Sequence, residues 1–195
     1  MIVHETAVIY PNVVMGEGAI IEPYAIVGIE DRFHDASDLN IGASAFIGSR
    51  CTIYTGVKAG NNFDVSDQTT IFTNNIFGDN VRIGPKAVIK NGCSIGNNVR
   101  INAQVFMERV VIENDVFIGP QAVFTNDMHP PCPRNSECVG KTHIEPFVSI
   151  GAGVVLAPGI RVSHHTQISS GSVVVSDIPA SSVVGGNPAR VLKDF

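Results

Sequence analysis

The sequence has few charged residues, few cysteines, no tryptophan and no long hydrophobic run. Charged residues make up 16% of its 195 residues, against roughly 25% in ordinary globular proteins. The net charge is −5 and no block of Lys or Arg occurs, which argues against a nucleic-acid binder. No apolar run approaches the roughly 20 residues that would span a bilayer, and the first residues lack a signal-peptide pattern. Four cysteines are too few for a disulfide scaffold. These absences predict one cytoplasmic globular domain over residues 1–195 that binds neither nucleic acid nor membrane.

What the sequence has instead is a six-residue repeat. An anchor residue, mostly aliphatic, recurs at every sixth position from Val3 to Val27, from Ile41 to Met107 and from Ile144 to Ala180. A five-residue step after Met107 leads into a third short run, 112–124, and 21 of the 27 anchors are Ile, Leu or Val. A period of six matches neither one face of a helix nor a series of hairpins. It predicts short parallel strands joined by tight corners, with three repeats in each 18-residue coil.

The other positions of the repeat agree with this interpretation. Gly often follows the anchor, and Asn, Asp or Gly fills the corner, where a positive φ is needed. Cys51 and Cys93 fall on the inward small-residue position, which predicts core packing. The expected fold is therefore all-β, a parallel β-helix shaped as a triangular prism of about nine coils. Two loops are expected to leave it, at about 28–40 and 126–143, and a C-terminal tail at about 186–195.

Two motifs, taken together with the repeat, resemble those of a known family. The first is Ile-Gly-Pro-Gln-Ala-Val-Phe-Thr-Asn-Asp-Met-His-Pro at 118–130, and the second is Ser-Asp-Ile-Pro at 176–179 followed by Val-Gly-Gly-Asn-Pro-Ala-Arg-Val at 184–191. Over nearly its whole length the chain resembles the hexapeptide-repeat acyltransferases, whose β-helix is left-handed. The Phe-Thr-Asn-Asp stretch is most similar to enzymes that acetylate an amine on a nucleotide-linked sugar. The His-Pro after it is similar to the galactoside-type O-acetyltransferases, which carry their catalytic histidine there.

The resemblance implies an activity, a co-substrate and an assembly. The expected reaction is acetyl transfer from acetyl-CoA to the amine of a nucleotide-linked amino sugar, and the alternative is O-acetylation of a sugar, as in the galactoside and maltose enzymes. The expected assembly is a homotrimer in which His129 of one subunit faces Asn102 of its neighbour. Serine O-acetyltransferases are a poorer match, because the repeats start at Val3 with no helical extension before them.

Five polar residues are candidates for contact with the acceptor. His129 is the natural base, because an imidazole titrates near neutrality, although a solvated loop histidine is the plain alternative. Asn102 takes the slot after an anchor and matches the polar strand that contacts the acceptor in similar enzymes, with Gln104 beside it. Asn126 and Asp127 are expected to hold the sugar or orient His129, or else to cap the loop through their own backbone.

The resemblance places CoA in a groove between neighbouring prisms, against the C-terminal coils. Ala152 and Ser170 would offer backbone groups to the amide-rich pantetheine arm. Ser176, with Val175, matches a pair of positions that often includes Lys, so a charged contact is missing there. Arg190 and Lys193 are the cations left to meet a CoA phosphate, and Arg suits bidentate phosphate contacts.

A metal site, a carbonic anhydrase and a non-catalytic module are the alternatives to an acetyltransferase. Cys132 and Cys138 lie between His129 and His143 without the close cysteine pair of structural zinc sites, so no metal is expected. A carbonic anhydrase on the same prism would need three histidines on adjacent coils. Outside the loop the candidates are far apart along the axis: His4, His164 and His165. A non-catalytic assembly module remains open, and such a module would not bind CoA.

Overall fold

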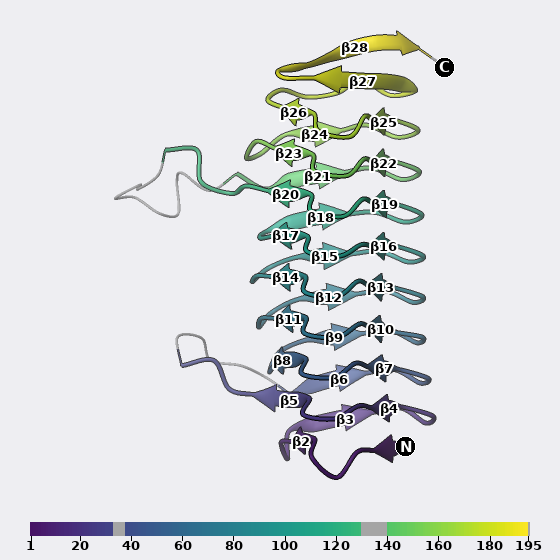
Figure 1. Ribbon diagram of the computed structural model, residues 1–195, viewed down its shortest axis with the longest axis vertical. Helices are drawn as coiled ribbons and strands as arrows, with labels where there is room; N and C mark the ends of the chain where they lie inside the picture. Colours follow the sequence, from purple (N-terminus) through teal and green to yellow (C-terminus); the bar gives the residue numbers. More distant parts are fainter. Residues whose placement is uncertain (33–37, 130–139, 195) are drawn as a thin grey trace.

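The computed structural model describes residues 1–32, 38–129 and 140–194, and these wind into a parallel β-helix of about nine coils. Three sheets form the sides of the prism (Figure 1). Most strands pair with the strand 18 residues away, as Ile2 does with Ile20. The five-residue step shortens this spacing to 17 where Arg100 pairs with Phe117, and the loops lengthen it to 26 where Val13 pairs with Leu39 and to 32 where Val123 pairs with Val155. Helices are absent from the described ranges, so none there is long and apolar enough to cross a membrane.

The strands of each sheet are short and follow one another up the prism. Sheet A contains β1 (Ile2–Val3), β4 (Ile20–Ile21), β7 (Phe46–Ile47), β10 (Asp64–Val65), β13 (Arg82–Ile83), β16 (Arg100–Ile101), β19 (Phe117–Ile118), β22 (Ser149–Ile150), β25 (Gln167–Ile168), β27 (Ser182–Gly186) and β28 (Ala189–Asp194). Sheet B contains β2 (Val8–Ile9), β5 (Ile26–Ile29), β8 (Thr52–Tyr54), β11 (Thr70–Ile71), β14 (Val88–Ile89), β17 (Phe106–Met107), β20 (Val123–Phe124), β23 (Val155–Leu156) and β26 (Val173–Val174). Sheet C contains β3 (Val13–Met15), β6 (Leu39–Ile41), β9 (Lys58–Ala59), β12 (Ile76–Phe77), β15 (Ser94–Ile95), β18 (Val110–Ile112), β21 (Thr142–Ile144) and β24 (Arg161–Val162).

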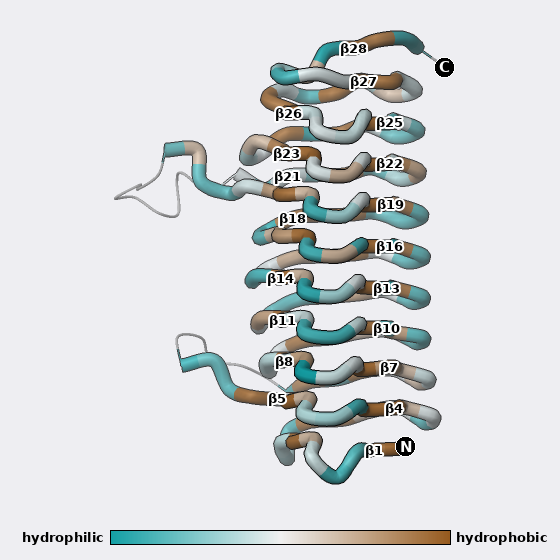
Figure 2. Tube along the Cα trace, viewed as in Figure 1, coloured by the Kyte–Doolittle hydropathy of each residue, from teal (hydrophilic) through white to brown (hydrophobic). Residues whose placement is uncertain are grey.

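The anchors fill the interior of the prism, as the repeat predicts. Ile53, Ile83 and Leu156 are fully buried, and Figure 2 shows hydrophobic strands alternating with hydrophilic corners on each coil. Cys51 and Cys93 are buried in the same core, which confirms their predicted packing role. Two ends depart from the pattern: in the first coil Val3 is 38% exposed, and in the last coil Ile178 is buried where the repeat predicted Ala180.

The corners are tight because successive coils nearly touch there. A Cβ on Gly119 would lie 2.6 Å from the backbone nitrogen of Ala152 on the next coil, which explains why glycine so often follows the anchor. Asn62, Asn80 and Asn98 take the positive φ predicted for corner residues. Their side chains bond one another from coil to coil, at 2.8 Å for Asn62 Nδ2 to Asn80 Oδ1.

Both expected loops leave the prism at the same edge. We call the three edges the AB, BC and CA corners, after the sheets that each one joins. The loops follow β5 and β20, so both leave from the BC corner, and Figure 1 shows them projecting from one side. The tail expected over about 186–195 is, through Asp194, a strand: β28 folds back on β27 as an antiparallel hairpin that extends sheet A at the C-terminal end.

Candidate active site

The predicted site residues lie on the two corners that flank sheet B. Four follow strands of sheet A, at the AB corner: Asn102, Gln104, Ala152 and Ser170. Five follow strands of sheet B, at the BC corner: Asn126, Asp127, His129, Val175 and Ser176. Within one chain the width of sheet B therefore separates the two groups.

At the AB corner, the side chains of Asn102 and Gln104 bond to the next coil. Asn102 Nδ2 donates to the carbonyl oxygen of Ile118 at 2.7 Å, so this half-buried amide supports the corner of the coil. Gln104 Oε1 accepts a hydrogen bond from Gln121 Nε2 at 2.9 Å. As predicted, Asn102 is level with Gly119 on the adjacent coil, since Ile101 pairs with Ile118. The structural role of Asn102 is thus visible, and its contact with an acceptor stays a prediction.

Ala152 and Ser170 stand one coil apart on the same corner. The Ala152 backbone N–H donates to Ser170 Oγ at 3.1 Å, and the Gly171 N–H donates to the Ala152 carbonyl at 2.8 Å. Their contact with the pantetheine arm stays a prediction. The Ala152 N–H, however, already has a partner within the chain.

At the BC corner, His129 lies in the segment that follows β20. Asp127 Oδ1 accepts the backbone N–H of His129 at 2.9 Å, which is the loop-capping arrangement considered for Asp127. The Gly140 N–H closes the base of the loop on the carbonyl of Asn126 at 3.0 Å. The His129 side chain is exposed, and no ring hydrogen bond to another described residue holds it. A base that must reach a substrate would be placed this way.

The C-terminal coils bring together three of the predicted cofactor residues. Val175, Ser176 and Arg190 line one hollow of about 380 Å³ between β26 and the β27–β28 hairpin. Val175 is 52% exposed, and Arg190 Nη1 donates to the Ala189 carbonyl at 2.8 Å while its side chain remains at the surface. Lys193 lies further along β28, where it pairs with Val183, outside this hollow.

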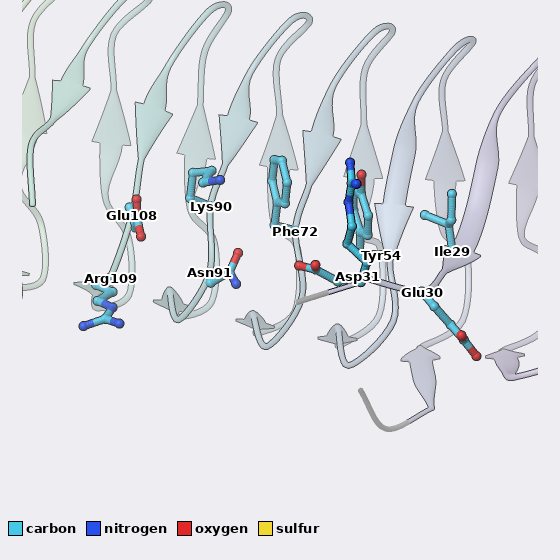
Figure 3. Close-up of a pocket in the computed structure, with 10 residues that line it drawn as sticks. Ile29, Glu30, Asp31, Tyr54, Phe72, Lys90, Asn91, Glu108 and Arg109 are labelled. Atoms are coloured by element: carbon cyan, nitrogen blue, oxygen red, sulfur yellow. The ribbon is translucent and has the colours of Figure 1, made fainter. Parts of the chain in front are cut away.

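Lower on the BC corner is a larger groove that the repeat did not predict. It has a volume of about 600 Å³, and Figure 3 shows its side chains rising from successive coils. Tyr54, Phe72 and Lys90 occupy the slot after the anchor on three consecutive coils, whereas the same slot at this corner holds Gly28 on the coil below them and Ala157 higher up. In the sequence, the signal for this groove was the run of large side chains at the slot after the anchor on consecutive coils, a slot that can also hold Gly or Ala.

Charged pairs lie on and next to strands β18, β21 and β24, at the C-terminal end of sheet C. His143 Nε2 lies 2.6 Å from Glu113 Oε1, and Glu145 accepts from the His164 backbone N–H at 2.9 Å and from Arg161 Nε at 2.6 Å. The His164 N–H and then Arg161 hold the pKa of the Glu145 carboxyl below its ordinary value of 4.5, against the effect of burial.

No group of three metal-ligating side chains occurs among residues 1–32, 38–129 and 140–194. Cys132 and Cys138 lie outside the described residues.

The outer face of sheet B carries no charge. Its outward side chains form one row along the prism: Val8, Ile26, Thr52, Thr70, Val88, Phe106, Val123, Val155 and Val173. The outward rows of the other sheets include charged residues, such as Asp64 and Arg82 on sheet A and Lys58 and Arg161 on sheet C. The uncharged outward row thus distinguishes sheet B from the other two sides of the prism.

Comparison with known families identifies the repeat. Residues 76–109 match the bacterial transferase hexapeptide (six repeats), and residues 39–66 match the hexapeptide repeat of succinyl-transferase. The chain is 35% identical over 86 residues to galactoside O-acetyltransferase from Lactococcus lactis, covering 42% of each chain. It is 37% identical over 78 residues to 2,3,4,5-tetrahydropyridine-2,6-dicarboxylate N-acetyltransferase from Clostridium perfringens, covering 40% of this chain and 30% of the other. The chain thus spans less than half the length of these curated relatives.

Solved structures confirm the fold class. UDP-N-acetylglucosamine O-acyltransferase from Moraxella catarrhalis superposes with a TM-score of 0.83 at 23% identity, over 100% of this chain and 75% of the other. This likeness confirms the left-handed β-helix expected from the family resemblance. A hexapeptide-repeat acetyltransferase from Vibrio cholerae, solved with acetyl coenzyme A, matches with a TM-score of 0.52 at 28% identity, over 58% of this chain and 67% of the other.

Proposed function

We propose that this chain, whose repeats are those of the bacterial hexapeptide transferases, is an acetyl-CoA-dependent acyltransferase that acetylates the amine of a nucleotide-linked amino sugar. One observation carries the proposal: the predicted reactive residues lie on the two corners that flank an uncharged face. Three prisms packed around their B faces would set the BC corner of each beside the AB corner of the next. His129 of one subunit would then meet Asn102 of its neighbour.

The chemistry assigned to His129 is proton transfer. The acceptor nitrogen attacks the thioester carbon, a C–N bond forms, and the C–S bond breaks to release CoA. An ammonium acceptor loses one proton to solvent before the attack, the attacking nitrogen loses a second proton as the amide forms, and the leaving thiolate gains one. The exposed imidazole of His129 can take the proton that the attacking nitrogen loses and pass it to the thiolate, because an imidazole ring nitrogen can accept a proton and then donate it.

Asn102 is assigned to hold the acceptor. Its Nδ2 already donates one hydrogen bond to the Ile118 carbonyl, which fixes the direction of the amide. The second N–H and the Oδ1 atom carry no other hydrogen bond to a described residue, so they are the groups that would meet an amine or a hydroxyl.

The C-terminal hollow fits one end of acetyl-CoA. Exposed Val175 supplies apolar surface and Arg190 supplies a cation that suits a phosphate. Ser170 and Ala152, across sheet B, would reach the cofactor from the neighbouring subunit. With Ser176 in place of the lysine common in similar enzymes, Arg190 is the cation of this hollow.

A sugar O-acetyltransferase is the second candidate. The match to galactoside O-acetyltransferase and the His-Pro at residues 129 and 130 favour it. A hydroxyl acceptor would need the base more than an amine does, because a hydroxyl is a weaker nucleophile until its proton is removed.

A thiol-release assay with acetyl-CoA tests both candidates. We expect release with at least one nucleotide-linked amino sugar, and a loss of about 10²- to 10⁴-fold in kcat for His129→Asn. Release with a free sugar hydroxyl and with no amine would select the second candidate. If His129→Asn kept more than about a third of the wild-type kcat, His129 would not be the base.

A further inference from the structure

The large groove on the BC corner contains a row of side chains, which we call the inner row. Ile29, Tyr54, Phe72, Lys90 and Glu108 stand one above another on successive coils, as Figure 3 shows. The Tyr54 and Phe72 rings are stacked, with centroids 4.9 Å apart and planes 7° apart. Lys90 Nζ lies 4.1 Å from the Phe72 ring centroid on the next coil. The inner row therefore offers an apolar strip that ends in an ammonium held by a cation–π contact.

The five-residue step shapes the upper end of this groove. Because Val111 pairs with Ser94, the corner that corresponds to residues 90–93 on the coil below is only residues 108–110 here. Arg109 takes the positive-φ position, with φ at 52°, and its side chain is exposed beside Glu108. The corner is thus one residue shorter, and Arg109 lines the groove from the coil next to that of Lys90.

The groove leads toward His129. The coil that carries Glu108 pairs directly with the coil of β20, from which the His129 segment departs. From the coil of Tyr54 to that coil there are four steps, or ~19 Å at the usual spacing between strands. A single sugar ring would cover about one such step. A ligand that reached from the groove to His129 would have to be several rings or phosphates long.

We propose that this groove binds the nucleoside diphosphate part of the acceptor and thereby directs the amino sugar at its other end toward His129. The inference rests on the proposed function, because it assigns the distal half of the same substrate. Lys90 and Arg109 are the cations that meet the diphosphate. The strip of Ile29, Tyr54 and Phe72 contacts the base and ribose. Glu30, next to Ile29 at the lower end of the strip, is an acceptor for ribose hydroxyls.

The chemistry favours a diphosphate ester over a free sugar for three reasons. The groove has a volume of about 600 Å³, within the range of sites that enclose a ligand of nucleotide size. Lys90 and Arg109, two of the cations that line it, come from the two coils between the aromatic strip and the His129 coil. That order of base, phosphates and sugar is the order of groups along a nucleotide-linked sugar.

Binding of plain nucleoside diphosphates to the full chain tests the proposal without the acceptor. UDP, dTDP and GDP would each be titrated by calorimetry, and CoA would be titrated separately. At least one diphosphate should bind, and Lys90→Gln should weaken it at least about tenfold while leaving CoA binding unchanged. Phe72→Leu should weaken it too, since Leu keeps apolar bulk but offers no ring to Lys90. Lys58→Gln, which removes an exposed lysine from sheet C, is the matched control and should have no effect.

The outcomes separate this proposal from the proposed function. If CoA binds and no diphosphate does, the groove assignment is wrong while the transferase assignment stands. Equal diphosphate binding by wild type and Lys90→Gln would also overturn it. If neither CoA nor any diphosphate binds to folded wild-type protein, the proposed function itself fails. In steady-state assays, Lys90→Gln should raise KM for the nucleotide-linked acceptor at least about tenfold and change kcat little, because it acts on binding.

Discussion

The division of the site between two corners makes a quantitative prediction about mixed trimers. His129→Asn should disable the BC corner of its own subunit, and Asn102→Ala should disable the AB corner. If each site takes one corner from each of two neighbours, subunits with different defects can complement each other. A site contained within one subunit would show no complementation.

The expected recovery follows from three-fold symmetry. In any trimer that contains both variants, one of the three boundaries joins a wild-type His129 to a wild-type Asn102, whichever variant is present twice. Mixed trimers should therefore show about a third of wild-type kcat per subunit. The His129→Asn homotrimer should have about 1% or less, because loss of a general base costs roughly 10²- to 10⁴-fold.

Co-expression with two different affinity tags provides the mixed trimers. Sequential purification on both tags removes the homotrimers, and a thiol-release assay measures kcat. Separately purified homotrimers mixed just before the assay serve as the control for subunit exchange. Activity of doubly purified trimers that stays at the level of the parents would refute the shared site, and a monomer near 20.7 kDa in sedimentation would refute the assembly.

Three further predictions concern the cofactor, the core and acid stability. Arg190→Ala should raise KM for acetyl-CoA by about 10- to 100-fold and leave the acceptor KM unchanged, since a charge-assisted hydrogen bond contributes about 1.5–3 kcal/mol. Equal binding of CoA and dephospho-CoA by the wild-type protein would count against a contact between Arg190 and the 3′-phosphate. Burial raises the pKa of Cys51 and of Cys93 to about 11, so of the four cysteines no more than two should react with a thiol reagent at pH 8 until the chain is unfolded. The Glu145 carboxylate, whose pKa is lowered, stabilises the fold above pH 4.5, and this contribution is lost as pH falls through its lower folded value. The Tm of Glu145→Gln should thus lie below that of wild type at neutral pH, with a gap that closes in acid.

The sequence predicts the prism well because its information is periodic. Anchors such as Ile53 and Ile83 repeat often enough that both the inward direction and the 18-residue coil follow from spacing alone. The prediction fails where the period ends. Ile178 replaces Ala180 in the core because the last corner gives way to the segment before the β27–β28 hairpin, and nothing in the repeat encodes that change.

The site was harder to predict because its contacts join different coils. The bond from Asn102 to the Ile118 carbonyl depends on a coil-to-coil register that the short step alters. The stack of Tyr54 on Phe72 joins residues 18 apart, and in the sequence each looks like a separate exception to the Gly that often follows the anchor. Only the geometry of the coil shows that such exceptions meet at one corner.

Because the coils stack at a constant spacing, the distance between two parts of the molecule along the prism can change only in fixed steps. Adding 18 residues moves everything above the insertion by one coil spacing of ~4.8 Å and returns each side chain to the same corner. The separation between the Tyr54–Phe72 strip and His129 can therefore change only in such increments while both stay on the BC corner. In this scaffold, the length of a substrate could be matched by gaining or losing whole coils, with no redesign of the residues at either end.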